Sequence, residues 1–376
     1  MALIALFVGF FLAYANGSND NFKGVATLFG SGTTNYRRAL LWATATTFIG
    51  SIAALILAQG LVATFSGKGL VPDAVLMQQS FPSAVALSAA ITVILASRLG
   101  FPISTTHALT GALVGAGWLA STTGVNLTRL GTHFLLPLLI SPGLAILLAS
   151  AVYPMFRFGR EKFGITRESC LCIGQEELQP ALSINNASAM ATLPAMAAFP
   201  ALTLGSTTSC QQRYTGSIVG IRAQALLDSA HWLSAAIVSF ARGLNDTPKI
   251  AALLLVVGAM RPSLTIGFVA IGIALGGLLN ARKVATTLAH RVTAMNAGQG
   301  FTANLATGLI VIFASRLGLP VSTTHVSCGA LFGIGTITRQ AHWKTIATIL
   351  LAWVTTLPLA ALFGAGTFFI LERFRL

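Results

Sequence analysis

Two short segments carry an Asn-Asp pair with a lysine three residues after the aspartate. They are Asn16–Lys23 (NGSNDNFK) and Arg242–Lys249 (RGLNDTPK), and the second lies 226 residues after the first. The chain has only nine acidic residues, and Asp20 and Asp246 hold the same position of this motif in largely apolar sequence. An ionisable group inside a membrane segment is costly and usually has a function. We therefore expect the two motifs to form part of a buried site.

The spacing of the charged groups predicts how they meet. Asp20 and Lys23, like Asp246 and Lys249, would share one face of a helical turn. Each lysine could simply neutralise its aspartate, or the two ammonium groups could also face a bound anion. The aspartates could also cap re-entrant helices, and Pro248 would suit the first turn of a helix that begins near Asp246. The recurrence of both lysines favours a role in a shared site.

A longer repeat brings together groups that bind oxyanions. Ser97–Gly117 (SRLGFPISTTHALTGALVGAG) and Ser315–Gly335 (SRLGLPVSTTHVSCGALFGIG) are identical at 14 of 21 positions. In each copy the Gly-x-Pro sequence should end one helix and Ser-Thr-Thr should open the next, because serine is a favoured N-cap. The unpaired backbone N–H groups, the positive helix end and the hydroxyls would suit an oxyanion. One such turn could be a plain cap, but two related by pseudosymmetry could point at a single tetrahedral ligand.

The predicted substrate site combines amide, carboxylate, ammonium and hydroxyl groups from both copies. Its residues are Asn19, Asp20, Lys23, Ser104, Thr105, Thr106, Asn245, Asp246, Lys249, Ser322, Thr323 and Thr324. The candidates for coupling are Asp20, Asp246, His107 and His325. The two histidines end the Ser-Thr-Thr-His runs and could be packed, hydrogen-bonded residues or members of a proton relay. Arg98 and Arg316, just before each break, could anchor at the interface or draw anions inward.

The composition indicates that these motifs are held by helices in a lipid bilayer. Hydrophobic residues make up 55% of the chain and charged residues 9%, against about 25% charged in soluble domains. Apolar stretches such as Ala39–Phe65 and Ile346–Ile370 supply the ~20 residues that a spanning helix needs. We predict an all-α polytopic membrane protein with ten to twelve membrane segments, some too short to cross alone. The net charge of +14 does not indicate a nucleic-acid partner, because the basic residues cluster at segment ends.

The repeats divide the chain into two related halves. Both motifs recur in the same order at offsets of 226 and 218 residues, so the gene was duplicated. We predict a first transmembrane repeat over residues 1–157, a central loop or insert over 158–217, and a second transmembrane repeat over 218–376.

The positive charges indicate that the two halves are inverted. The Arg-Arg pair at 37–38 aligns with uncharged residues 263–264, and the Arg-Lys pair at 282–283 aligns with uncharged residues 56–57. Positive loops that exchange between repeats are expected when the repeats have opposite orientation. The predicted fold is therefore two inverted-topology repeats with broken or re-entrant helices.

The central segment carries a basic run, Arg157–Arg167. Cytoplasmic loops are enriched in Lys and Arg, so we predict that this segment is cytoplasmic. Cys170, Cys172 and Cys210 should then stay reduced, and a metal site made by them would lack a neighbouring histidine. The stretch Ala187–Leu204 is apolar but interrupted by proline, and it could lie on the membrane surface or form a small folded insert. We predict no cofactor and no metal site.

The Asn-Asp motif in each half, together with the paired Pro-[Ile/Val]-Ser-Thr-Thr-His segments, resembles the inorganic phosphate transporter (PiT) family. That family also includes sulfate-transporting members. The resemblance covers both halves and leaves out only the central loop. It implies an inverted-repeat helical fold and cation-coupled uptake of phosphate across the plasma or inner membrane. It also implies binding at the Asn-Asp motifs and the Ser-Thr-Thr turns. A homodimer is a candidate assembly.

One departure from the family pattern bears on the coupling ion. The family motif reads like Gly-Ala-Asn-Asp-Val-Ala-Asn-Ala, whereas Lys23 and Lys249 replace its second asparagine here. Two carboxylates and an anion would require added cations, but two aspartates and two lysines already balance. An uncompensated charge in a dry site is very costly. Our hypothesis is that the ammonium groups stand in for sodium ions, which makes a sodium site doubtful and favours H⁺ over Na⁺ as the coupling ion.

Three other functions fit less of the sequence. A permease for sulfate or a related oxyanion would use the same donors, and the lysines favour a ligand that only accepts hydrogen bonds. An intramembrane enzyme using His107 or Asp20 would need a nucleophile, base and orienting group, and no such set is apparent. A metal-cation carrier is disfavoured because the motif charges sum to zero and the turns are rich in donors.

Overall fold

The structure is a computed structural model that describes residues 2–174, 201–206 and 219–374. The α-helices, in chain order, are α1 (Ala2–Asp20), α2 (Ala26–Gly30), α3 (Tyr36–Leu57), α4 (Gln59–Phe65), α5 (Asp73–Leu76), α6 (Ser80–Leu99), α7 (Thr105–Ala120), α8 (Leu127–Leu130), α9 (Leu136–Lys162), α11 (Ala223–Val256), α12 (Pro262–Asn280), α13 (Arg282–Thr286), α14 (Ala297–Arg316), α15 (Thr323–Ile337) and α16 (Trp343–Arg373). Shorter elements are the 3₁₀ helix η1 (Lys23–Val25) and the π-helices η2 (Gly131–Leu135) and η3 (Thr287–Arg291). The chain divides into two compact units, Met1–Tyr153 with His231–Leu376, and Pro154–Ala230.

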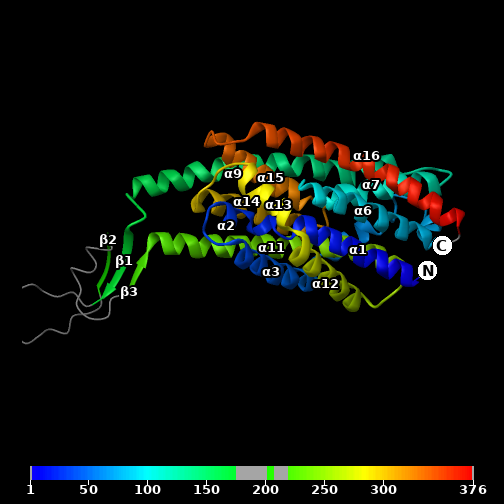
Figure 1. Ribbon diagram of the computed structural model, residues 1–376, viewed down its shortest axis with the longest axis horizontal. Coiled ribbons are helices and arrows are strands. Elements are labelled where there is room, and N and C mark those ends of the chain that lie inside the picture. The colour runs from blue at the N-terminus through cyan, green and yellow to red at the C-terminus, as the bar shows by residue number, and fades with distance from the viewer. Residues whose placement is uncertain (1, 175–200, 207–218, 375–376) are drawn as a thin grey trace, which may run out of the picture. The chain divides into compact units, whose positions relative to one another are not determined.

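The first unit is a bundle of helices suited to a bilayer (Figure 1). Among the described residues of the whole chain, six helical stretches are long and apolar enough to cross a membrane: Tyr36–Leu57, Ser80–Leu99, Leu127–Lys162, Pro262–Asn280, Ala297–Arg316 and Trp343–Arg373. Large apolar side chains such as Leu139, Val354 and Leu362 are exposed, as expected for residues that face lipid. The prediction of a helical membrane fold is confirmed.

Both predicted breaks occur between consecutive helices of the repeat. α6 ends at Leu99, and Gly100 adopts the left-handed conformation (φ 79°) that glycine tolerates best. The Ser104 hydroxyl then caps α7 by accepting a hydrogen bond from the His107 N–H at 3.0 Å. In the second copy Gly318 (φ 68°) follows α14, and Ser322 caps α15 in the same way at 3.2 Å.

The two Asn-Asp motifs differ in their backbone. In the first half α1 ends at Asp20, and η1 and α2 follow. In the second half α11 runs without a break from Ala223 to Val256, with Pro248 inside it. The predicted helix start near Asp246 is therefore wrong. A proline removes only one backbone hydrogen bond, and membrane helices tolerate this where neighbouring helices pack around them.

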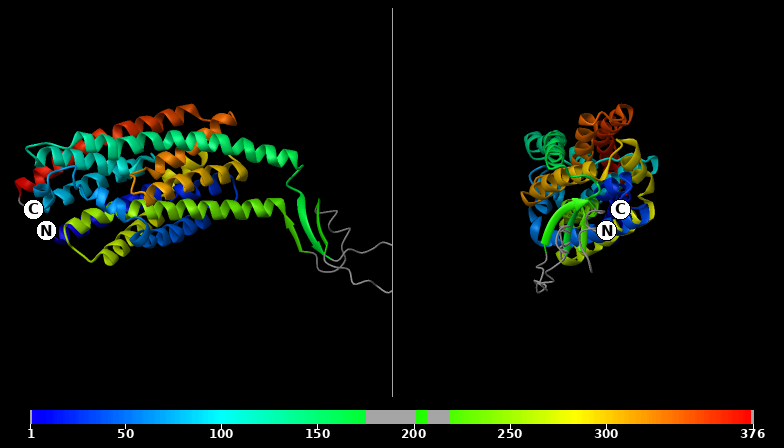
Figure 2. Two further views of the ribbon diagram at one scale, coloured as in Figure 1. Left: turned by 180° about the vertical axis from the view of Figure 1, so that it is seen from behind. Right: turned by 90° about the vertical axis from the view of Figure 1, so that its left-hand side faces the viewer.

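The direction of equivalent helices agrees with inverted repeats. α1 and α11 carry equivalent motifs, and α1 begins at the end of the helical unit where both chain termini lie (Figure 1). The part of α11 within this unit runs the other way and ends near those termini (Figure 2). Two equivalent helices that run in opposite directions are expected of an inverted duplication.

Close helix packing depends on small residues. α1 packs against both α12 and α6, and α16 packs against α7. A Cβ built on Gly276 of α12 would lie 1.9 Å from the backbone oxygen of Tyr14 in α1. Glycines at such points let helix backbones approach closely, which is how helices associate in lipid.

The described residues of the second unit include a small three-stranded sheet. β1 (Ser169–Gly174) lies between β2 (Ala201–Ser206) and β3 (Val219–Arg222), and both pairs are antiparallel. Cys170 is buried on β1. Cys210 lies outside the described residues, and so does the part of the apolar stretch Ala187–Leu204 that precedes residue 201.

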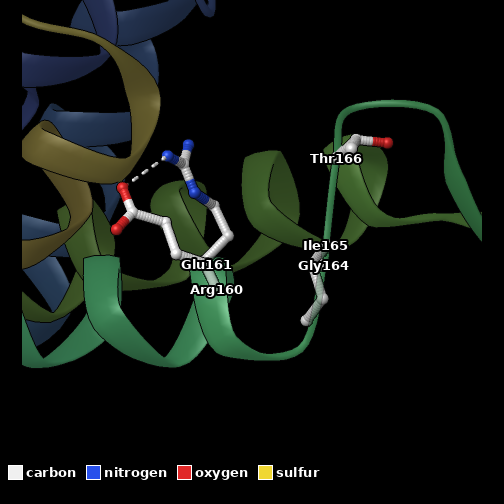
Figure 3. A pocket seen from close by; sticks show the side chains of 5 residues that line it. All are labelled: Arg160, Glu161, Gly164, Ile165 and Thr166. Atoms are coloured by element: carbon white, nitrogen blue, oxygen red, sulfur yellow. Dashed lines mark ion pairs between the residues drawn. The ribbon is translucent and has the colours of Figure 1, made fainter.

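A hollow in the second unit is lined by Arg160, Glu161, Gly164, Ile165 and Thr166 (Figure 3). An Arg160 guanidinium nitrogen lies 3.8 Å from a Glu161 carboxylate oxygen, and both side chains are more than half exposed. Exposed ion pairs of this kind contribute little to stability, and we assign no function to this hollow.

Candidate functional site

All twelve predicted substrate-site residues lie in the interior of the helical unit, and none is more than 4% exposed. Hydrogen bonds link the Asn-Asp motif of each half to the Ser-Thr-Thr turn of the other half. The sequence places these motifs more than 140 residues apart, so the fold itself assembles the site.

Lys23 connects three elements. Its ammonium group donates hydrogen bonds to the Asp20 carboxylate, to the Thr324 hydroxyl at the start of α15, and to the Ile103 carbonyl at 2.9 Å. Ile103 lies in the break just before α7. The predicted Asp20–Lys23 pair therefore forms, but its lysine also reaches the turn of the second half.

Lys249 makes the equivalent contacts from the second half. Its ammonium donates to the Thr106 hydroxyl and to the Val321 carbonyl, both at 2.8 Å, and lies 3.6 Å from an Asp246 oxygen. Val321 holds the position in the second break that Ile103 holds in the first. When residue i contacts j′ and i′ contacts j, the two halves are related by a two-fold axis. The site thus lies on the pseudo-two-fold axis of the duplication.

The Asn19 amide closes the break between α6 and α7. Its Nδ2 donates to the Ser97 hydroxyl at 3.0 Å and to the Phe101 carbonyl at 2.9 Å, and its Oδ1 accepts from the Ile103 N–H at 3.2 Å. A buried backbone that leaves a helix must find such partners. Asn19 therefore positions the turn that carries the hydroxyls.

Asn245 holds the second break in a similar way. Its Nδ2 donates to the Val321 carbonyl at 3.2 Å, and its Oδ1 accepts from the Ser315 hydroxyl at 3.2 Å. Ser97 and Ser315 were not among the predicted site residues. Both copies of the 21-residue repeat begin with serine, and this shared residue is the sequence feature that could have indicated their role.

The two carboxylates meet at Asn16. Its Nδ2 lies 3.0 Å from an Asp20 oxygen, 3.0 Å from the Thr105 hydroxyl and 3.3 Å from an Asp246 oxygen. Thr105 in turn donates to the same Asp20 oxygen at 3.0 Å. Asn16 opens the first motif but was not predicted to take part in the site.

Arg242 is a further buried cation. It is 1% exposed, its Nη2 donates to Asn16 Oδ1 at 2.7 Å, and its Nε lies 3.7 Å from an Asp246 oxygen. Its Nη1 donates to Asn21 Oδ1 at 3.1 Å and to the Thr47 hydroxyl at 3.3 Å. The expectation that the buried charges balance must be corrected, because Arg242 raises the sum over the two aspartates, two lysines and one arginine to +1.

The two predicted histidines form a pair. The imidazole centroids of His107 and His325 lie 4.4 Å apart at an interplanar angle of 84°. His325 also packs edge-on against Trp353 of α16, with centroids 3.8 Å apart. Arg98 and Arg316 are exposed, so the structure does not bring these two arginines into the buried site.

Comparison with known proteins decides the family. The family described as the phosphate transporter family matches residues 16–364 of this chain. The chain belongs to the phosphate transporter family. The members of this family are transporters, and the intramembrane-enzyme alternative is therefore set aside.

Relatives of this phosphate transporter family member resemble it along nearly the whole chain. A protein of Thermococcus kodakarensis, named as a phosphate permease, is 27% identical over 98% of this chain and 97% of its own. The chloroplastic inorganic phosphate transporter 2-1 of Arabidopsis thaliana is 26% identical over 96% of this chain and 70% of its own. A solved structure described as the sodium-dependent phosphate transporter has a TM-score of 0.74, with 21% identity and 99% of each chain covered. That likeness confirms the fold.

In this family member the site is closed off from the surface, because every predicted substrate residue is buried. A transporter exposes a central site to one side at a time by moving one repeat against the other. The bonds of Lys23 and Lys249 between the halves are the contacts that such a movement would have to exchange.

Proposed function

We propose that the protein is a proton-coupled importer of inorganic phosphate that does not require sodium, with the twelve residues above as its substrate site. Phosphate as the substrate is supported by the family and by the names of the relatives. The observation that carries the proposal on coupling is the surroundings of the two lysines.

Each ammonium occupies a set of oxygens that would otherwise suit a small cation. Around Lys23 these are a carboxylate, a main-chain carbonyl and a hydroxyl. In transporters, carbonyls of unwound helices and helix C-terminal ends coordinate the coupling ion. Here the carbonyls of Ile103 and Val321 are engaged by lysines. A lysine ammonium group therefore occupies each position at which a sodium ion would bind.

The sign of the site favours an anion. The N-termini of α7 and α15 carry the positive ends of their helix dipoles, and the five buried charged groups sum to +1. A phosphate ion would meet hydroxyls and backbone N–H groups at both helix starts. The same positive sum opposes a metal-cation cargo.

Sulfate or a related oxyanion is the second candidate, since a tetrahedral acceptor fits the same groups. The experiment that separates these possibilities is uptake of radiolabelled phosphate and sulfate into proteoliposomes under separate proton and sodium gradients. We expect phosphate uptake driven by protons alone. Sulfate uptake without phosphate uptake would show that the substrate is sulfate and not phosphate. Dependence of uptake on sodium would refute the proposed role of the lysines.

A matched variant tests the lysines directly. The double substitution Lys23→Asn and Lys249→Asn removes both tethered cations and leaves the oxygens in place. We expect proton-driven uptake to fall and any remaining uptake to be stimulated by sodium. If the double variant retains the rate and ion dependence of the original protein, the lysines do not replace sodium.

We also propose that the carrier lies in the plasma or inner membrane with its central segment in the cytoplasm. The basic residues Arg157, Arg160 and Lys162 at the end of α9 support this orientation. Protease added to the outside of intact cells should then leave this segment uncut. Cleavage of the segment would show that the orientation is the opposite one.

A further inference from the structure

The paired imidazoles are titratable groups that the substrate site does not use. His107 and His325 are the third residues of α7 and α15. Their backbone N–H groups donate the hydrogen bonds that the cap serine hydroxyls accept. Their side chains meet across the pseudo-two-fold axis. They therefore lie in the first turns of the two helices at which an oxyanion would bind.

Three ring nitrogens of the pair are buried without a hydrogen-bond partner among the described residues. His325 is 2% exposed, and neither of its ring nitrogens has a hydrogen-bond partner among the described residues. Nδ1 of His107 is likewise unpartnered there. A buried polar group without a partner is costly and calls for an explanation. A site that binds and releases a proton is one such explanation.

Trp353 holds His325 in place. The Trp353 indole N–H donates to the Pro102 carbonyl at 3.1 Å, which fixes the ring next to the first break. The imidazole lies against this ring. Aromatic rings stabilise a neighbouring cation, so an imidazolium would be accommodated at this position.

The charges around the pair explain when a proton would bind. The charged groups that act on it are Lys249 from α11 and Lys23 from η1, and both positive charges oppose an imidazolium until an anion offsets them. Cys328 is the next titratable group along α15. With Arg242 the buried charges sum to +1, so a singly charged anion balances them and a doubly charged anion leaves −1. One imidazolium would restore neutrality.

We propose that the His107–His325 pair takes up the proton that accompanies a doubly charged oxyanion into the site. The inference rests on the proposed function and names its proton-binding group. The proton comes from water on the side from which the anion enters, and it adds to the lone pair of an imidazole nitrogen. No bond of the anion breaks, and the proton leaves to water when the anion is released.

The direct test is nitrogen NMR of the purified full-length chain labelled with ¹⁵N-histidine. Calorimetry first establishes the phosphate concentration that saturates the protein. We expect saturating phosphate, at a pH where it is mostly doubly charged, to convert one imidazole to an imidazolium. That signal should vanish in His107→Asn/His325→Asn and persist in His133→Asn, a control whose histidine is exposed.

A second readout is the selectivity of the double variant. Phosphate can still bring its own proton as the singly charged ion, whereas sulfate cannot. We therefore expect sulfate affinity to fall at least about tenfold more than phosphate affinity, because a buried charge is left uncompensated. Equal losses for both anions would contradict the proposal, since the pair would then have no special role for a doubly charged ligand.

The outcomes separate the two levels of inference. If calorimetry detects no binding of phosphate, the proposed function fails and this inference fails with it. If phosphate binds but the histidine signals of the original protein do not change, only the histidine assignment is overturned. If the double variant does not fold, the spectrum of the original protein alone decides.

Discussion

A single buried arginine sets the charge of this site. Arg242 occupies the position equivalent to Asn16, and the two residues meet through a hydrogen bond of 2.7 Å. The duplicated halves therefore differ at their point of contact. This asymmetry gives a net positive interior without disturbing the symmetric contacts of the two lysines.

We expect Arg242→Gln to weaken phosphate binding at least about tenfold. Loss of a buried, hydrogen-bonded charge in comparable sites costs about 2–5 kcal/mol, and here it also removes the positive excess that an anion would neutralise. Calorimetry or uptake at several phosphate concentrations measures the effect.

The matched control is Arg261→Gln, which removes an exposed arginine just before α12. It should leave phosphate affinity unchanged. Unaltered affinity in Arg242→Gln would show that this arginine serves only to hold α11 against α1.

At the scale of elements, broken helices and close packing together position the site. The breaks before α7 and α15 place two helix starts in the interior. Asparagine side chains there donate hydrogen bonds to backbone carbonyls that lie outside the helices. α1 carries the first Asn-Asp motif and reaches the site by packing against α12. Its position depends on the absence of a side chain at Gly276.

We expect Gly276→Ala to lower the stability of the protein. The added Cβ would lie 1.9 Å from the Tyr14 oxygen, so α1 must shift, and overpacking of this kind costs about 1–3 kcal/mol. The midpoint of thermal unfolding in detergent should fall, and uptake should fall with it.

Gly267→Ala on the same helix is the control, because a Cβ there has no heavy atom within 4 Å. Alanine is the better helix former, so this variant should be as stable as the original protein or more so. Equal behaviour of the two variants would contradict the role of close packing.

At the scale of the whole molecule, each of the two inverted halves contributes residues that contact the site residues of the other half. Each half supplies the lysine that binds the other half's turn. A rocking movement of one half against the other would break one set of these contacts and open the site to one side.

Inversion predicts that equivalent loops lie on opposite sides of the membrane. Arg37 and Ser263 are exposed positions 226 residues apart, at the starts of α3 and α12. We expect a membrane-impermeant maleimide to label Arg37→Cys and Ser263→Cys from opposite sides, relative to the labelling of the unsubstituted protein. Labelling of both from the same side would contradict an inverted repeat.

The sequence by itself determined the class of protein, the duplication and the motifs whose side chains the fold brings together. Apolar composition and segment length are properties of the chain alone, and an internal repeat can be read without a structure. The caps Ser104 and Ser322 were also predictable, because a helix start depends on a few neighbouring residues. The helix start near Asp246 was not, since packing around α11 outweighs the local signal of one proline.

Only the tertiary structure decided which groups meet. Lys23 bonds to Thr324 across 301 residues of chain, and Arg242 bonds to Asn16 across 226. No local pattern specifies such contacts, because they depend on how the two halves face each other. The burial of Arg242, which makes the site positive, and the pairing of His107 with His325 follow from that arrangement.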